Sequence, residues 1–280
     1  MDKELHSWIG RTETRSDQIT AAPMIALSAT LDRDDPAPQP GDPIPPLWHW
    51  LWFLPSDRQS ELGADGHAKR GGFLPPIALP RRLWAGGRFE FRAPLRVGET
   101  LTRTSRIADI QQKSGRAGPL VFVTVRHEIH DVQAVRLTEE HDIVYRNRPD
   151  PGAAAPPPPE APAESDWERV IQPDDVLLFR YSALTFNSHR IHYDRRYATE
   201  VEGYPGLVVH GPLVATLLLD LLRRNLPHAD IARFTFRATS PLFDGAPFTI
   251  CGRAEGKTVL LWAKDADGRL AMSAEALGRF

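Results

Sequence analysis

Residues 179–198 of this 280-residue chain carry side chains whose types and spacing could move a proton. Asn187, His189 and His192 stand at i, i+2 and i+5. An imidazole has an ordinary pKa of about 6.5 and can gain or lose a proton near neutral pH, whereas an amide can only orient a ligand by hydrogen bonds. Polar groups this dense, between an apolar strand and an apolar helix, indicate a functional site.

Two other chemistries fit this segment less well. His189 and His192 have the spacing of a metal-binding pair, but no cysteine or carboxylate arrangement completes a ligand set. Ser182 and Ser188 lie near histidines in the sequence, yet neither stands in the Gly-x-Ser-x-Gly turn of a serine hydrolase. We therefore expect neither a bound metal nor a serine nucleophile.

A helix over residues 210–225 is expected to help position these groups. Its apolar residues follow the 3.6-residue period and cover a face too wide for a helix that lies on a surface. Pro212 suits the first helical turn, and Arg223 and Arg224 suit the negative C-terminal end. The pattern predicts a helix that is wrapped by a curved sheet.

The strands of that sheet recur in both halves of the chain. The string Phe-x-Phe-Arg-Ala begins at Phe89 and again at Phe234, 145 residues later, and each copy is followed by segments of period-two alternation. The later segments are 101–107, 120–129 and 135–145 in the first half, and 248–253, 259–264 and 270–277 in the second. A second helix, over residues 16–30, is expected ahead of the first set. The chain therefore reads as an α+β double hot-dog, with antiparallel strands wrapping a long central helix in each unit and one continuous sheet shared by both units.

A proline-rich segment divides the two units. Seven of the sixteen residues at 149–164 are proline, which favours an extended spacer. We expect an N-terminal unit over 1–148, this linker over 149–164 and a C-terminal unit over 165–280. The first unit also contains an aromatic excursion, Trp-His-Trp-Leu-Trp-Phe at 48–53, which either covers a ligand tunnel or completes an open core.

Composition restricts the partners and the compartment. The formal net charge is −2, with 34 basic and 36 acidic residues, so we expect no nucleic-acid partner. The single cysteine, the polar N-terminal segment and the absence of a long apolar stretch favour the cytosol, with no membrane segment.

Four segments resemble a known family. Phe-Asn-Ser-His-Arg-Ile-His-Tyr-Asp at 186–194 and Gly-Leu-Val-Val-His-Gly-Pro-Leu at 206–213 are similar to the two signatures of the MaoC-like hot-dog (R)-specific enoyl-CoA hydratases and dehydratases. With the segments at 48–55 and 71–88, they resemble the branch of mesaconyl-C4-CoA and itaconyl-CoA hydratases, close to the 3-hydroxyacyl-thioester dehydratases. The resemblance implies a lyase that reversibly hydrates a 2-enoyl thioester without a metal or redox cofactor. CoA would enter as part of the substrate, and the enzyme would be a homo-oligomer, a dimer or larger.

Carried over residue by residue, the family's catalytic Asp falls on Asn187, its Asn on His189 and its His on His192. The resemblance therefore implies His192 as the acid–base group and Asn187 as the residue that positions water, with His189 as the candidate to replace the missing carboxylate. Backbone N–H groups at the start of the helix, at Gly211 after His210, would stabilise the thioester oxyanion.

Other residues and activities complete the hypothesis. Arg190, Tyr193 and Tyr181 are the expected substrate-binding residues, with Arg190 as counter-ion for a distal carboxylate. The first unit has no histidine-containing match to residues 186–192 and is expected to be degenerate. A fatty-acid-type 3-hydroxyacyl-thioester dehydratase, a non-catalytic acyl-thioester-binding subunit and a thioesterase using Asp194 or Glu202 are the alternatives.

Overall fold

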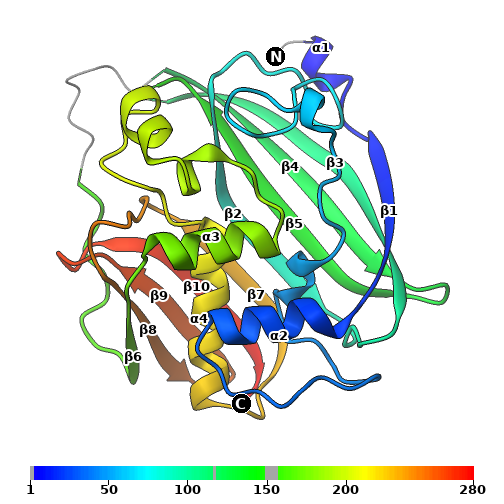
Figure 1. Ribbon diagram of the computed structural model, residues 1–280, viewed down its shortest axis with the longest axis vertical. Helices are drawn as coiled ribbons and strands as arrows, with labels where there is room; N and C mark the ends of the chain where they lie inside the picture. Colours follow the sequence, from blue (N-terminus) through cyan, green and yellow to red (C-terminus); the bar gives the residue numbers. More distant parts are fainter. Residues whose placement is uncertain (1–2, 116–117, 149–156) are drawn as a thin grey trace.

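Ten antiparallel strands form one continuous sheet through both halves of the protein (Figure 1). The structure, a computed structural model, describes residues 3–115, 118–148 and 157–280. The strands of the first half are β1 (Thr12–Gln18), β2 (Arg81–Phe91), β3 (Thr100–Gly115), β4 (Gly118–His130) and β5 (Val135–Arg146). Those of the second half are β6 (Trp167–Ile171), β7 (Asp230–Ala238), β8 (Phe248–Glu255), β9 (Thr258–Lys264) and β10 (Leu270–Arg279).

The strand order is symmetric about the centre of the sheet. It runs β1-β3-β4-β5-β2-β7-β10-β9-β8-β6, so each half repeats the other outward from the β2–β7 pair. The two Phe-x-Phe-Arg-Ala strings are these central strands, and Phe89 lies opposite Phe234 where they pair. Both phenylalanine side chains are buried, as the period-two alternation predicts. The predicted duplication of strands around one shared sheet is therefore present.

The predicted apolar helix is α4 (Gly211–Asn225). Pro212 stands in its first turn, and every residue at positions 213–222 is buried. The helix packs against β6, β8, β9 and β10, so the second half of the sheet wraps it. Among the described residues, no helix is long and apolar enough to cross a membrane.

The second predicted helix is present, but it is shorter than expected and is not the counterpart of α4. Residues 16–18 belong to β1, because the alternating segment Thr12–Gln18 pairs with β3. The helix that follows, α2 (Ala21–Thr30), has ten residues and lies beside α3 (Asp175–Leu184) across the front of the molecule (Figure 1). Since α2 follows β1 as α3 follows β6, α3 is the counterpart of α2, and its residues had not been predicted to be helical.

In the first half, the position equivalent to α4 holds an irregular segment. Only two 3₁₀ turns, η1 (Trp48–Leu51) and η2 (Gln59–Glu61), occur between α2 and β2. Prolines interrupt this segment repeatedly and prevent a long helix. The side chains of Trp48, Leu51, Trp52 and Phe53 are buried in the main core. They therefore complete the core, which was one of the two expectations for the aromatic segment at 48–53.

The same segment also forms one wall of a cavity of about 640 Å³. Residues 43–49, residues 91–96 and the last turns of α4 line this cavity. It lies at the C-terminal end of α4, whereas the histidines predicted to act lie at the N-terminal end. The remaining short helices are α1 (Lys3–His6), η3 (Arg190–His192) and the π-helical η4 (Tyr197–Val201).

Part of the expected linker can be placed. Residues 149–156 lie outside the described residues. The remaining residues of the linker lie beside the turn between β9 and β10. There Glu160 and Arg269 form an isolated antiparallel β-bridge, and the N–H of Ala161 donates to the carbonyl of Gly268.

Candidate functional site

His192 lies at the end of η3, close to the start of α4, and its side chain is buried. Its Nδ1–H donates to the carbonyl oxygen of Val208 at 2.7 Å. This bond fixes the tautomer and leaves Nε2 as a proton acceptor. Burial lowers the pKa of His192 to about 4, although the Val208 carbonyl acts in the opposite direction. The imidazole is therefore neutral at pH 7.

His210 stacks directly on His192. The two ring centroids are 3.7 Å apart with an interplanar angle of 18°. Its Nε2 is 2.8 Å from the Oγ of Ser182 on α3, and its ring centroid lies 5.1 Å from that of Tyr181, with the two rings edge to face. Burial, together with the neighbouring His192 and His189, lowers the pKa of His210 well below its ordinary value. Ser182, set aside as a nucleophile in the sequence analysis, here holds the orientation of a histidine.

His189 and Asn187 complete the predicted trio. The ring of His189 stands edge-on to His192, with centroids 5.4 Å apart. Burial and the nearby His67 and His192 lower the pKa of His189. The Oδ1 of Asn187 accepts a hydrogen bond from the backbone N–H of His189 at 3.0 Å. Asn187 therefore fixes the turn on which His189 is carried.

A fourth imidazole, which sequence reasoning missed, comes from the first half of the chain. The ring centroid of His67 lies 4.0 Å from that of His189. Its Nδ1–H donates to the Oδ2 of Asp65 at 3.1 Å, and its backbone N–H donates to Oδ1 of the same carboxylate at 3.1 Å. One donor atom each from Asp65, His67 and His189 lies within 4.8 Å of the others, a set that could also ligate a cation. The one available signal was the Asp-Gly-His step at 65–67.

The charges of this pair are fixed by their surroundings. Burial and the positive charge of Arg82 lower the pKa of His67 to about 4, although Asp65 acts to raise it. Burial acts to raise the pKa of Asp65, but the hydrogen bonds and charge of His67 lower it below its ordinary value. At neutral pH, a carboxylate therefore stands behind a cluster of neutral imidazoles.

Hydrogen bonds tie the turn at 63–67 to the motif at 186–194. The backbone N–H of Arg190 donates to the carbonyl of Asp65 at 2.9 Å, and its Nη1 donates to the carbonyl of Ala64 at 3.0 Å. The hydroxyl of Ser188 donates to the carbonyl of Gly66 at 2.5 Å. Gly66 has a φ of +88°, and a Cβ there would stand 1.8 Å from the carbonyl oxygen of Ser188. Only glycine fits this close approach.

The expected substrate-binding residues lie around this cluster. The Nε and Nη2 of Arg190 donate to Asp194 at 3.0 and 2.7 Å, so much of the guanidinium is already paired within the protein. Tyr193 is 47% exposed, and its hydroxyl donates to the carbonyl of Ser188 at 3.1 Å. Tyr181 is buried beneath His210, and burial raises its pKa.

Gly211 begins α4 directly after His210. A Cβ at this position would meet no heavy atom within 4 Å, so there is open space beside the backbone. Among the described residues, none accepts a hydrogen bond from the N–H of Gly211. An unpartnered N–H at the positive end of a buried helix is suited to bind a developing oxyanion. A neutral imidazole beside such a donor can promote the addition of water to a double bond that is conjugated with the carbonyl bound by the donor.

Comparison with known proteins agrees with this chemistry. Residues 47–244 match the hydroxyacyl-thioester dehydratase type 2 family. The chain is 52% identical over 271 residues to the mesaconyl-C4-CoA hydratase of Chloroflexus aurantiacus, with 96% of this chain and 95% of that protein covered. It is 30% identical over 275 residues to the mitochondrial hydroxyacyl-thioester dehydratase type 2 of Schizosaccharomyces pombe, covering 84% and 88%.

Solved structures share the fold. A MaoC-like dehydratase superposes with a TM-score of 0.71 over 99% of both chains at 15% identity. A Mycobacterium tuberculosis protein with a double hot-dog fold gives a TM-score of 0.59, covering 96% of each chain at 16% identity. The predicted α+β double hot-dog is thereby confirmed.

Proposed function

Because the chain belongs to the hydroxyacyl-thioester dehydratase type 2 family of MaoC-like hot-dog enzymes, we propose that it hydrates a short branched dicarboxylic enoyl-CoA. The chain is a hydro-lyase, and the finer assignment concerns its substrate. Mesaconyl-C4-CoA is the first candidate, and itaconyl-CoA is the second. The observation that carries the proposal is the 52% identity to a mesaconyl-C4-CoA hydratase along nearly the whole of both chains.

The geometry supports a simple division of work. Nε2 of His192 would accept a hydrogen bond from a water molecule and help to remove its proton as the water oxygen bonds to the β-carbon of the substrate. The N–H of Gly211 would hold the thioester oxygen as negative charge develops there. CoA would enter as part of the substrate, and neither a metal nor a redox cofactor would take part.

A panel of enoyl-CoA esters tests the substrate. Loss of the absorbance of the conjugated thioester should be fastest with mesaconyl-C4-CoA or itaconyl-CoA. A clear preference for crotonyl-CoA or a longer plain enoyl-CoA would replace this assignment by a fatty-acid-type 3-hydroxyacyl-thioester dehydratase, which the Schizosaccharomyces pombe relative favours. Binding without turnover of any ester would favour a non-catalytic acyl-thioester-binding subunit.

We further propose that the enzyme works in the cytoplasm as a homo-oligomer. Its one cysteine, Cys251, is buried and free, which suits a reducing compartment. Light scattering coupled to size-exclusion chromatography would measure the assembly.

Asn187 can be tested by two substitutions. Asn187→Ala removes the acceptor of the His189 N–H and should lower kcat by less than loss of His192 does, because water can partly replace an amide. Asn187→Asp keeps that acceptor and restores the family's carboxylate, so activity should be unchanged or higher. A loss in Asn187→Asp as large as that in Asn187→Ala, measured by steady-state hydration, would show that the amide N–H₂ is the group that matters.

Gly211→Ala tests the path of the thioester. The added methyl group has open space in the structure, so the fold should be retained. It would stand where a thioester approaches the helix start, and kcat/KM should fall by about 10- to 100-fold, which is less than the usual cost of losing an oxyanion donor. Gly245→Ala is the matched control, because a Cβ there also meets no heavy atom within 4 Å. Equal kcat/KM in both variants would place the thioester elsewhere.

A further inference from the structure

We propose that His67, oriented by Asp65, is a second proton-transfer group of this site and fills the role that the family gives to the carboxylate replaced here by Asn187. This inference rests on the proposed hydratase function. It assigns a chemical part to the first half of the chain, which the sequence analysis expected to be degenerate.

The hydrogen bonding of His67 carries the first step. Its Nδ1–H is committed to Asp65, so Nε2 is the acceptor. Among the described residues, none forms a hydrogen bond with Nε2 of His67 or with Nε2 of His192. His189 lies next to both rings, 4.0 Å from the first and 5.4 Å from the second. Two acceptors without protein partners among the described residues therefore lie next to the same imidazole.

The local charge distinguishes His67 from the other histidines. Its imidazole is the one in this cluster that is hydrogen-bonded to a carboxylate, whereas His192 donates only to a backbone carbonyl. A proton taken up by a buried imidazole must be stabilised by a nearby negative charge. Asp65 supplies that charge, and it holds the tautomer that leaves Nε2 free, as the aspartate of a catalytic triad does. The side chain of His67 is still 23% exposed, so water can reach it.

The proposed step conserves atoms and charge. A water molecule donates one hydrogen bond to Nε2 of His67 and one to Nε2 of His192, with an oxygen lone pair directed at the β-carbon. As the C–O bond forms, the double-bond electrons move to the thioester oxygen, and one proton passes from water to this pair of imidazoles, where Asp65 stabilises the positive charge through His67. The enolate then takes that proton at the α-carbon, which restores the carbonyl and the neutral imidazole. No other reactant is needed.

The surroundings favour this role over metal binding at Asp65, His67 and His189. Arg82 and Arg70 lie close enough to lower the pKa of His67, and their positive charge also opposes a divalent cation. In addition, both oxygens of Asp65 accept hydrogen bonds from His67. A metal would have to share both carboxylate oxygens with these bonds.

The test compares Asp65→Asn, His67→Gln and the double variant on a substrate that the wild type hydrates. We expect kcat to fall by about 10²- to 10³-fold in His67→Gln and about 10- to 100-fold in Asp65→Asn, with KM little changed. The double variant should be no slower than His67→Gln, because Asp65 acts through His67. Lys69→Gln, an exposed change in the same segment, is the matched control and should match the wild type.

The pH profile separates this role from a merely structural one. Asp65 raises the pKa of His67 against the effects of burial, Arg82 and Arg70. A charge on His67 in turn lowers the pKa of the neighbouring His189 and His192. Loss of the carboxylate should therefore move the acid limb of kcat/KM to lower pH in Asp65→Asn, while Lys69→Gln leaves it in place.

Three results would overturn the inference while leaving the hydratase function intact. They are activity above half of the wild type in both single variants, an unshifted acid limb in Asp65→Asn, or loss of activity with EDTA that zinc restores in protein shown to contain zinc. Since Gly66, Ser188 and Arg190 hold the turn, both variants should keep their Tm. If one of the two variants, Asp65→Asn or His67→Gln, unfolds, the kinetics of the other variant test the inference. A wild type that hydrates no enoyl-CoA would instead refute the proposed function.

Discussion

His192→Ala is expected to lower kcat by about 10² to 10⁴, the usual contribution of one general acid–base group. By the resemblance of this motif to the family's signature, the family's catalytic histidine falls on His192. Its Nδ1–H is held by Val208, so its Nε2 can serve as an acceptor. Its pKa of about 4 keeps it neutral and able to accept a proton throughout the neutral range.

Steady-state hydration kinetics and a thermal melt of the same preparation measure this effect. His228→Ala, which removes an exposed imidazole far from the motif in sequence, is the matched control and should match the wild type. Full activity of His192→Ala, on a substrate that the parent protein hydrates, would remove His192 from the mechanism. A fall in Tm with no fall in kcat would make it a packing residue.

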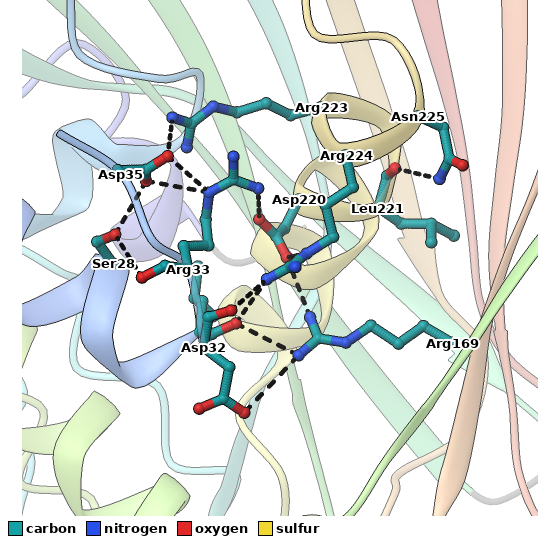
Figure 2. Close-up of polar contacts among 11 residues, drawn as sticks. Ser28, Asp32, Arg33, Asp35, Arg169, Asp220, Leu221, Arg223, Arg224 and Asn225 are labelled. Carbon is teal, nitrogen blue, oxygen red and sulfur yellow. Dashed lines mark hydrogen bonds and ion pairs between the residues drawn. The ribbon is translucent and has the colours of Figure 1, made fainter.

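Asp220→Asn is expected to reduce the free energy of unfolding by about 3–5 kcal/mol, the usual cost of breaking a buried ion pair from one side. Asp220 belongs to α4, and its side chain is only 1% exposed. It accepts hydrogen bonds from Arg33 at 2.8 Å, Arg169 at 3.1 Å and Arg224 at 2.7 Å (Figure 2). Without its charge, three partly buried guanidinium groups would lose their common partner.

Urea unfolding at neutral pH measures the loss. The matched control is Asp32→Asn in the same network, because that carboxylate is 90% exposed and its ion pair with Arg169 is 4.0 Å long (Figure 2). Its midpoint should differ little from that of the wild type, since exposed pairs contribute little. Equal midpoints for the two variants would mean that Asp220 is not the centre of this network.

The regular parts of the fold were predictable because their signals are local. Period-two alternation located the strands other than β1 and β6, and the repeated Phe-x-Phe-Arg-Ala string marked the two strands that meet at Phe89 and Phe234. The apolar residues of α4 formed an unambiguous helical pattern. By contrast, α3 was missed because the helix is only ten residues long and its apolar residues follow the helical period weakly. Asp174 was available as its N-cap, and its side chain does accept a hydrogen bond from the N–H of Leu177.

The candidate site was predictable only where its residues are near one another in sequence. His189 and His192 were expected together, and His210 follows within the second motif. Asp65 and His67 reach the site through a turn in an irregular segment, held by contacts such as the one between Gly66 and Ser188, 122 residues apart. No periodicity or propensity describes such a contact. The hydrogen bonds of Arg190 to the carbonyls of Ala64 and Asp65 could not be foreseen for the same reason.

The contact between Gly66 and Ser188 also limits how this duplicated gene can evolve. A copy that has lost its own motif is ordinarily free to drift or to be deleted. Here the backbone of the first copy is seated against the motif of the second, with no room for even a methyl group at Gly66. Recombination between diverged relatives at the boundary of the two halves would separate two backbone segments that are in close contact here. Residues 63–67 and 188–190 are therefore expected to be inherited as one unit, although most of the length of the first half lies between them.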